Sequence, residues 1–411
     1  MNHDSPAAQA PLSDAEGDRL MRRVLWRLVP FIFICYVISY LDRTNVGFAA
    51  ISMNQDLGLT ATMFGWAAGL FFFGYFMFEI PSNLLMQRFG ARVWIARIMI
   101  TWGLISMATA FATGPISFSI ARFLLGIPVA NIVGSPLSGW LMEQHGVWGL
   151  KNWQLLLVTE SMPAVLLGIA CLFVLVDAPN KAKWLNPREK AWLTQRLSQE
   201  QQAIGASHGN TLRAALTNPK VFTLAAINFC CIVGSIGIGL WLPQIIKSLG
   251  ISSGVVGLVV ALPYLLGAVA MTLWARLANR STHRLPYVAS ALAFAALALV
   301  SAALIDQPLL KIASLCLAVA GILSFQATFW AIPSTFLTGR AAAGGLALIV
   351  SIGNLGGFTG PFLIGLIKDA TQSFTLPFFA VASILLIGTC LMLWLGDPAK
   401  QQTPQGQGQA A

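Results

Sequence analysis

Long apolar runs alternate with short polar segments along almost the whole chain. Each run is about twenty residues or longer, the length that a helix needs to cross the roughly 30 Å hydrocarbon core of a bilayer. The runs cover residues 25–50, 61–83, 93–113, 116–142, 153–176, 220–246, 254–278, 286–305, 309–335, 341–367 and 374–396. This pattern predicts an all-α polytopic membrane protein.

Composition agrees with a membrane location and excludes several other classes. The residues AVILMFWYC make up 56% of the chain and charged residues only 10%, whereas a soluble domain carries about 25% charged residues. The net charge of +10 comes from basic clusters between apolar runs, as in cytoplasmic loops, so we do not expect nucleic-acid binding. The chain lacks GxxxxGK[ST], HExxH and GxSxG motifs, so we expect neither an enzyme nor a metal or cofactor site.

A polar segment at 178–216 divides the runs into two halves. It holds six Lys or Arg against two acids, and Asn186-Pro187-Arg188-Glu189 has the capping residues of a helix start, which predicts an amphipathic helix over 187–200. Basic turns recur at matching places in both halves, as in a duplicated transporter. The expected organisation is a disordered tail, an N-terminal bundle, a cytoplasmic linker, a C-terminal six-helix bundle and a second disordered tail, over residues 1–18, 19–177, 178–216, 217–396 and 397–411.

The distribution of basic residues predicts the sidedness of the chain. Arginines cluster at every second connection, while the intervening connections carry at most a lone lysine, at 151, 247, 311 or 368. The positive-inside rule therefore places both termini and the 178–216 segment in the cytoplasm, with the chain in the inner (plasma) membrane.

The same rule requires an even number of crossings between Arg92 and Lys181, where the sequence has only three runs. The middle run, 116–142, would be about 40 Å long as one helix, too long for one crossing and too short for two. Either it forms a hairpin that enters from outside and turns at 126–128, or the first bundle is broken. A hairpin preserves the sidedness, and we favour it.

Two opposite charges, Asp42 and Arg43, lie inside the first apolar run. Each would cost roughly 3 kcal/mol at the centre of a lipid-facing helix, so they must face protein or trapped water. Tyr36, Tyr40 and Arg43 follow an i, i+4, i+7 spacing and share one helix face. This polar stripe indicates the wall of a solute path; the alternative is a buried ion pair that only fixes packing.

Other polar side chains inside the runs are candidates for the same path. Arg122 offers a planar fork that suits a carboxylate, although it could instead pair with an acid such as Asp42 or Glu79. Tyr75 could donate to an anion or simply pack as an aromatic ring. Three candidates come from the second half, where packing is an equally good explanation: Trp330, Ser351 and Asn354.

Several motifs, taken together in order and spacing, resemble the major facilitator superfamily and, within it, the anion:cation symporter family. They are Tyr40-Leu-Asp42-Arg43-Thr-Asn45-Val-Gly47, Glu79-Ile-Pro81-Ser82-Asn83, Gln87-Arg88-Phe-Gly90-Ala-Arg92, Arg122-Phe-Leu-Leu-Gly126, Gly134-Ser-Pro136, Trp330-Ala-Ile-Pro333 and Ser351-Ile-Gly353-Asn354. The resemblance implies two six-helix bundles, alternating access, and proton-coupled uptake of a small organic anion such as a carboxylate. We expect a monomer in the lipid bilayer.

The resemblance also implies roles for individual residues. Asp42 resembles the proton-coupling acid of the family. The substrate-binding candidates are Arg43, Tyr75, Arg122, Tyr40, Trp330, Ser351 and Asn354. Gating or conformational roles fall to Glu79, Arg88, Gly90, Arg92 and Arg280.

The chain departs from the family pattern directly after Gly126, where a stretch of helix four, a loop and the start of helix five are missing. The second coupling carboxylate of the family would fall at Val129. The helix 4/helix 5 region is therefore shortened by an internal deletion, and we expect impaired proton coupling with surviving anion exchange. Alternatives are a proton/drug antiporter, or a truncated non-transporting relic or solute sensor.

Overall fold

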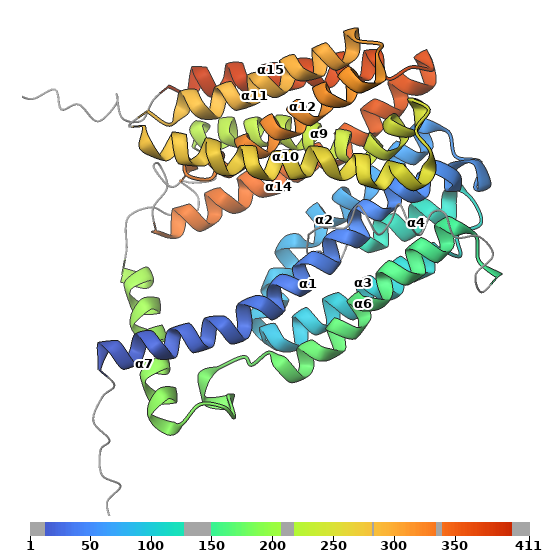
Figure 1. Cartoon of the computed structure of the whole chain (residues 1–411). Helices are drawn as coiled ribbons and strands as arrows, with labels where there is room; N and C mark the ends of the chain where they lie inside the picture. The colour runs from blue at the N-terminus through green and yellow to red at the C-terminus, as the bar shows by residue number, and fades with distance from the viewer. Residues whose placement is uncertain (1–12, 127–148, 207–217, 282, 334–338, 397–411) are drawn as a thin grey trace, which may run out of the picture.

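The helices form two bundles joined by a linker helix (Figure 1). The computed structural model describes residues 13–126, 149–206, 218–281, 283–333 and 339–396. The first bundle contains α1 (Asp14–Asp56), α2 (Ala61–Phe89), α3 (Ala91–Thr109), α4 (Pro115–Gly126) and α6 (Asn152–Val174). The second contains α9 (Pro219–Ser248), α10 (Ser253–Arg280), α11 (Leu285–Leu304), α12 (Pro308–Phe329), α14 (Gly339–Thr371) and α15 (Thr375–Leu395). Within the described ranges, nine helices are long and apolar enough to cross a membrane.

Helix α1 begins earlier than the apolar pattern predicted. It starts at Asp14, inside the stretch expected to be a disordered tail, because Ser13 and Glu16 form a reciprocal capping box. Its 43 residues correspond to a length of about 65 Å, roughly twice a hydrocarbon core. The first turns of α1 therefore extend beyond the span and pack through Leu20 against Leu185 and Leu193 of the linker.

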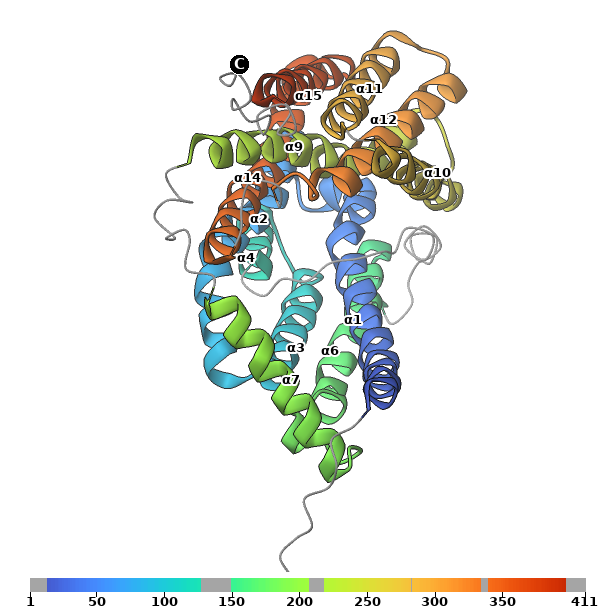
Figure 2. The same cartoon turned by 90° about the vertical axis from the view of Figure 1, so that its left-hand side faces the viewer.

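The linker forms the predicted amphipathic helix, α7 (Pro187–Ala206), after a short 3-10 turn at Pro179–Lys181. The Asn186 side chain accepts from the Glu189 amide at 2.8 Å, and Glu189 accepts from the Asn186 amide at 3.0 Å. The same carboxylate binds Arg23 of α1 at 2.8 Å. Figure 2 shows α7 lying across one end of the first bundle; this end is called the α7 end below.

The structure describes helix α4 over 12 residues, Pro115–Gly126, and the residues that follow lie outside the described part of the chain. Its last described residue, Gly126, lies so close to the backbone of Phe71 and Tyr75 in α2 that a side chain would not fit. Beyond Gly126, the predicted turn and the rest of that run lie outside the described residues. The next described helix, α6, begins where α3 ends, since the Gln154 amide donates to the Ala110 carbonyl at 2.8 Å. The end of α3 and the start of α6 thus lie at the same end of the bundle, as an even number of crossings between Arg92 and Lys181 requires.

The bundles meet at the end opposite α7. Their contacts involve α1 from Gly47 onward and the first turns of α2 on one side, and α9 and α14 on the other. One hydrophobic core runs through both bundles there, whereas separate small cores occupy the first bundle toward α7. In Figure 1 the two bundles diverge toward the α7 end.

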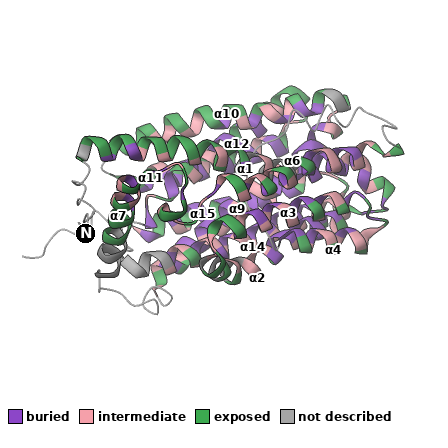
Figure 3. Cartoon of the chain, turned by 90° about the horizontal axis from the view of Figure 1, so that it is seen from below, coloured by how far each residue is buried: buried purple, intermediate pink, exposed green. Residues whose placement is uncertain are grey.

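Large apolar side chains remain on the outer faces of the helices. Examples are Phe173 at 82% exposed, Leu265 at 65% and Leu393 at 62%, and Figure 3 shows exposed residues along the outer sides of the bundles. A soluble monomer rarely leaves so much apolar surface uncovered. These faces are suited to contact with lipid chains.

Candidate functional site

The first bundle buries polar side chains from four helices. They include Asn45 on α1, Ser106 on α3, Arg122 on α4 and Glu160 on α6, each 2% exposed or less. Buried ionisable groups are costly and rare unless they are paired or functional. The interior of this bundle is therefore polar at several points, which fits a solute path rather than a purely structural core.

Arg122 is the predicted site residue that the structure describes most fully. It is 2% exposed, and its guanidinium carbon lies 5.2 Å from the centroid of the Phe71 ring on α2. Phe71 in turn packs edge-to-face on Trp102 of α3 at 5.7 Å. Tyr75 is half-buried one turn along α2, beside the end of α4. The structure thus brings Arg122 and Tyr75 to the same crossing of α2 and α4, with the cation held against an aromatic face.

Four other predicted residues lie on described helices, but their side chains are outside the described residues. These are Tyr40, Asp42 and Arg43 on α1, and Glu79 on α2. Their assigned roles remain predictions.

The candidates of the second half do not form one group. Ser351 is buried and Asn354 half-buried on α14, near the bond that Asn228 of α9 donates to the Ile349 carbonyl at 3.2 Å. Trp330 instead ends α12, is 42% exposed and stacks edge-to-face on its neighbour Phe329. Ser351 and Asn354 are thus placed at the α9–α14 contact, whereas Trp330 has the environment of a packed surface aromatic.

The predicted gating residues of the α2–α3 turn contact Asp177, the residue just before the linker. Gly90 has φ +86°, and a side chain there would collide with the carboxylate of Asp177, which accepts from the Arg92 amide at 2.8 Å. Arg88 and Arg92 have exposed side chains, as does Arg280 at the end of α10. Glycine is therefore required in this turn both for its backbone angle and for the approach of Asp177.

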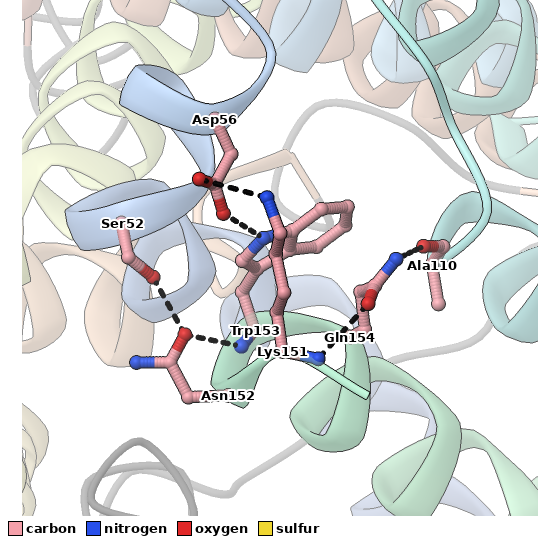
Figure 4. A network of polar contacts seen from close by, with 7 residues as sticks. All are labelled: Ser52, Asp56, Ala110, Lys151, Asn152, Trp153 and Gln154. Carbon is pink, nitrogen blue, oxygen red and sulfur yellow. Dashed lines mark hydrogen bonds and ion pairs between the residues drawn. The ribbon is translucent and has the colours of Figure 1, made fainter. Parts of the chain in front are cut away.

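A polar network that the sequence did not predict ties three helices together at the end opposite α7 (Figure 4). The Lys151 ammonium lies 3.0 Å from Asp56, and the Trp153 indole donates to the same carboxylate at 2.7 Å. Ser52 donates to Asn152 at 3.0 Å. The hydrogen bond from Lys151 lowers the pKa of Asp56 below its ordinary value, with a smaller contribution from Trp153.

A second unpredicted feature joins the two bundles. The Asp369 carboxylate of α14 accepts hydrogen bonds from the first two amides of α2, Ala61 at 3.0 Å and Thr62 at 2.6 Å. Thr60 accepts from the third amide, that of Met63, at 3.2 Å. Next to this cap, Gly65 of α2 and Gly365 of α14 lie against the backbone of the opposite helix, which allows the helices to touch. We call this contact the α2–α14 latch.

Two cavities in the described part of the chain are not lined by the predicted substrate residues. One, of about 640 Å³, is a largely apolar groove between α2 and α4 lined by residues such as Trp66 and Ile120. The other, of about 490 Å³, lies at the end opposite α7 and is described below. In this conformation Arg122 is enclosed by protein.

The family profile of the Major Facilitator Superfamily matches residues 32–131, 125–361 and 224–410. A protein of Agrobacterium vitis, provisionally named a tartrate transporter, is 44% identical over 411 aligned positions, which take in 92% of this chain and 91% of the relative. A quinolone resistance transporter of Acinetobacter baumannii is 36% identical, covering 92% of this chain and 95% of that protein. Among solved structures, an inward-facing bacterial homologue of the human lysosomal transporter Spinster has a TM-score of 0.71 at 14% identity, covering 92% of this chain and 97% of that one.

These similarities show that the chain belongs to the major facilitator superfamily and is a membrane transporter rather than an enzyme. The fold class predicted from the sequence is confirmed.

The alignment also bears on the shortened region. The 411 aligned positions include only 92% of a chain of 411 residues, so the relative has internal residues without a counterpart here. The first matched segment of the family profile ends at 131 and the next begins at 125, where the sequence departs from the family pattern.

Proposed function

We propose that this chain is a secondary active transporter that takes up a small organic anion, a carboxylate, with protons by alternating access. The observation that carries the proposal is the buried Arg122, held in the first bundle of a chain 44% identical to a protein named for tartrate. An arginine fork matches a carboxylate bidentately, and a water-poor site makes that contact strong.

The arrangement of the bundles supports alternating access. Their contacts lie at the end opposite α7, and the bundles diverge toward the other end (Figure 1). If the α7 end is cytoplasmic, this conformation is closed to the outside. Transport then requires the α2–α14 latch to open while the α7 end closes.

Proton coupling needs an acid whose charge state changes with the bound anion. Asp42 is the candidate from the sequence, and position 129 has no carboxylate. Glu160, 2% exposed on α6, supplies a second acid buried in the same bundle as Arg122. We therefore propose that Asp42 and Glu160 share the coupling role, and we expect proton-driven accumulation in place of the impaired coupling that Val129 suggested.

Transport assays on one reconstituted sample test this function. We expect labelled tartrate to accumulate when the outside is made acidic and to exchange in counterflow without a pH gradient. Glu160→Gln should reduce accumulation by about tenfold or more while counterflow stays within about twofold, because exchange does not require proton release. Absence of both activities in the parent chain would contradict the proposal. Equal loss of both in the Glu160→Gln variant would assign Glu160 to structure instead of coupling.

A proton/drug antiporter is the second candidate, favoured by the 36% identity to the quinolone resistance transporter. A cationic site does not suit a cationic drug. Expression of the chain in a drug-sensitive strain separates the two functions: we expect unchanged quinolone resistance together with tartrate uptake, and raised resistance without uptake would favour the antiporter.

The sidedness of the chain gives a further prediction. Basic segments of α1, the linker and the α2–α3 turn meet at the α7 end, and the positive-inside rule makes this end cytoplasmic. A cysteine at the exposed Gln195 of α7 should escape an impermeant thiol reagent in intact inner-membrane spheroplasts, whereas one at the exposed Ser252, before α10, should react. The reverse pattern would invert the topology. Five of the six native cysteines are buried, which keeps the background low.

A further inference from the structure

Three lysines from separate connections line one cavity at the end opposite α7. The cavity, of about 490 Å³, is bounded by the end of α9, the starts of α12 and α15, and the end of α14. Its lysines are Lys247, Lys311 and Lys368, and no Asp or Glu is among the residues that line it. These are three of the four single lysines in the connections that the sequence places outside. Folding therefore gathers isolated positive charges into one place.

Lys368 is held in position by aromatic rings rather than by an acid. Its ammonium lies 4.4 Å from the Phe374 ring centroid and 4.9 Å from that of Trp241. Its sequence neighbour Asp369 is occupied, because both of its oxygens accept from α2 amides. Across the described ranges, neither Lys311 nor Lys368 forms an ion pair with a carboxylate. Within those ranges, no ion pair therefore neutralises Lys311 or Lys368 at the cavity.

The remaining polar groups at the cavity are suited to a hydroxylated or carboxylated ligand. Helix α15 begins there at Thr375, whose amide donates to the Ser373 hydroxyl at 3.2 Å, so the positive end of the helix lies at this cavity. Ser373 and Gln244 add a hydroxyl and an amide to the lining. The Gln244 amide can donate to a ligand oxygen, whereas the Ser373 hydroxyl donates to Thr375 Oγ1 at 3.1 Å.

We propose that this cavity is an outer binding site for a small organic anion with two or more carboxylates. Lys311 and Lys368 lie on separate helices and can each bind one carboxylate. An anion with a single carboxylate can pair with only one of them. The site is separate from the central one, because Arg122 and Tyr75 do not line it. It goes beyond the proposed function by adding a first anion contact on the side from which the substrate would enter.

Lysine reactivity tests this site without any transport assay. The full-length protein in lipid nanodiscs is treated with an amine-acylating reagent, and the labelling rate of each lysine is followed by mass spectrometry. Succinate or tartrate, at about ten times its dissociation constant, should slow labelling of Lys311 and Lys368 about tenfold relative to sodium chloride of equal ionic strength. Lys151 is the internal control, because it lies at the same end, is 56% exposed and is already paired with Asp56.

Selective protection of Lys311 and Lys368 by the dicarboxylates supports the site. Equal slowing of Lys151, Lys311 and Lys368 would overturn the site. The same holds if the dicarboxylate slows no labelling at concentrations up to about 50-fold above that of the acylating reagent, since a bound anion must shield the lysines that hold it. Protection by acetate as strong as by succinate, at equal ionic strength, would likewise overturn the requirement for two carboxylates.

A kinetic test rests on the proposed function as well. The double variant Lys311→Gln/Lys368→Gln should raise the external KM for tartrate roughly tenfold with an unchanged maximal rate, as expected when charge steering is removed. Lys151→Gln should leave both values within about twofold. If the parent chain transports no tartrate but its lysines are still protected, the transport proposal fails and the outer site stands. An unchanged KM in a transporting double variant would show that the site plays no part in uptake.

Discussion

Replacement of Arg122 by alanine is expected to weaken tartrate binding by about 30-fold or more, since truncating one partner of a buried charge contact costs roughly 2–5 kcal/mol. The guanidinium is 2% exposed and packs on Phe71 at the crossing of α2 and α4. Arg122→Lys should keep only part of the affinity, because an ammonium cannot reproduce a bidentate contact. Arg43→Ala is expected to abolish binding as well, on the strength of the sequence alone. Equilibrium binding of labelled tartrate to purified protein measures these changes.

Loss of fold must be separated from loss of the site in this experiment. Arg97 is a matched control, because it is a half-buried arginine of the same bundle whose guanidinium lies 4.0 Å from the Trp94 ring. Arg97→Ala should retain tartrate binding within about twofold even if its melting temperature falls by a few degrees. If Arg122→Ala binds tartrate like the parent, the central site is elsewhere. If both Arg122→Lys and Arg122→Ala bind tartrate poorly and neither shows a cooperative melting transition, the loss of binding reflects unfolding, and Arg122 is structural.

Replacement of Asp369 by alanine should open the end of the molecule opposite α7. Two charge-assisted hydrogen bonds to the Ala61 and Thr62 amides hold α14 on the start of α2. Each such bond contributes about 1.5–3 kcal/mol, so their loss should shift the equilibrium between closed and open states by at least tenfold. Asp369→Asn should have a smaller effect, because its neutral amide accepts through only one oxygen.

Distances between spin labels measure this shift. Labels on the exposed Met63 of α2 and Gln372, just after α14, should move apart in a larger fraction of Asp369→Ala molecules than of the parent. Asp306→Asn is the control, because this exposed acid lies between α11 and α12 at the same end. An unchanged distance distribution in Asp369→Ala would mean that glycine-mediated packing alone keeps the bundles closed. A shift of equal size in Asp306→Asn would point to net charge instead of the cap.

Features that depend on near neighbours in the chain were predictable from the sequence. The helix start at Asn186 follows from four residues, because its two hydrogen bonds link positions three apart. The apolar runs correspond to helices because lipid leaves no partner for backbone groups except within the helix itself. The sequence also showed that the apolar runs around 116–142 give an odd number of crossings where the charges of the connections require an even number.

Boundaries were less predictable than helices. The run 25–50 became a helix from Asp14 to Asp56, because the polar first turns find a packing surface on α7 that hydropathy does not record. The run 116–142 contains α4, which is described as far as Gly126, where α4 crosses α2.

By itself, then, the sequence determined that the chain is an all-α polytopic membrane protein. It also showed Arg122 inside an apolar run, where a buried cation is costly. Tertiary structure decided which groups meet. Asp369 caps a helix 308 positions earlier in the chain, and Lys311 and Lys368 reach one cavity from different helices. The physical reason is that a hydrogen bond or a local potential depends on distance in space, and packing of the two bundles sets distances that no spacing along the chain contains.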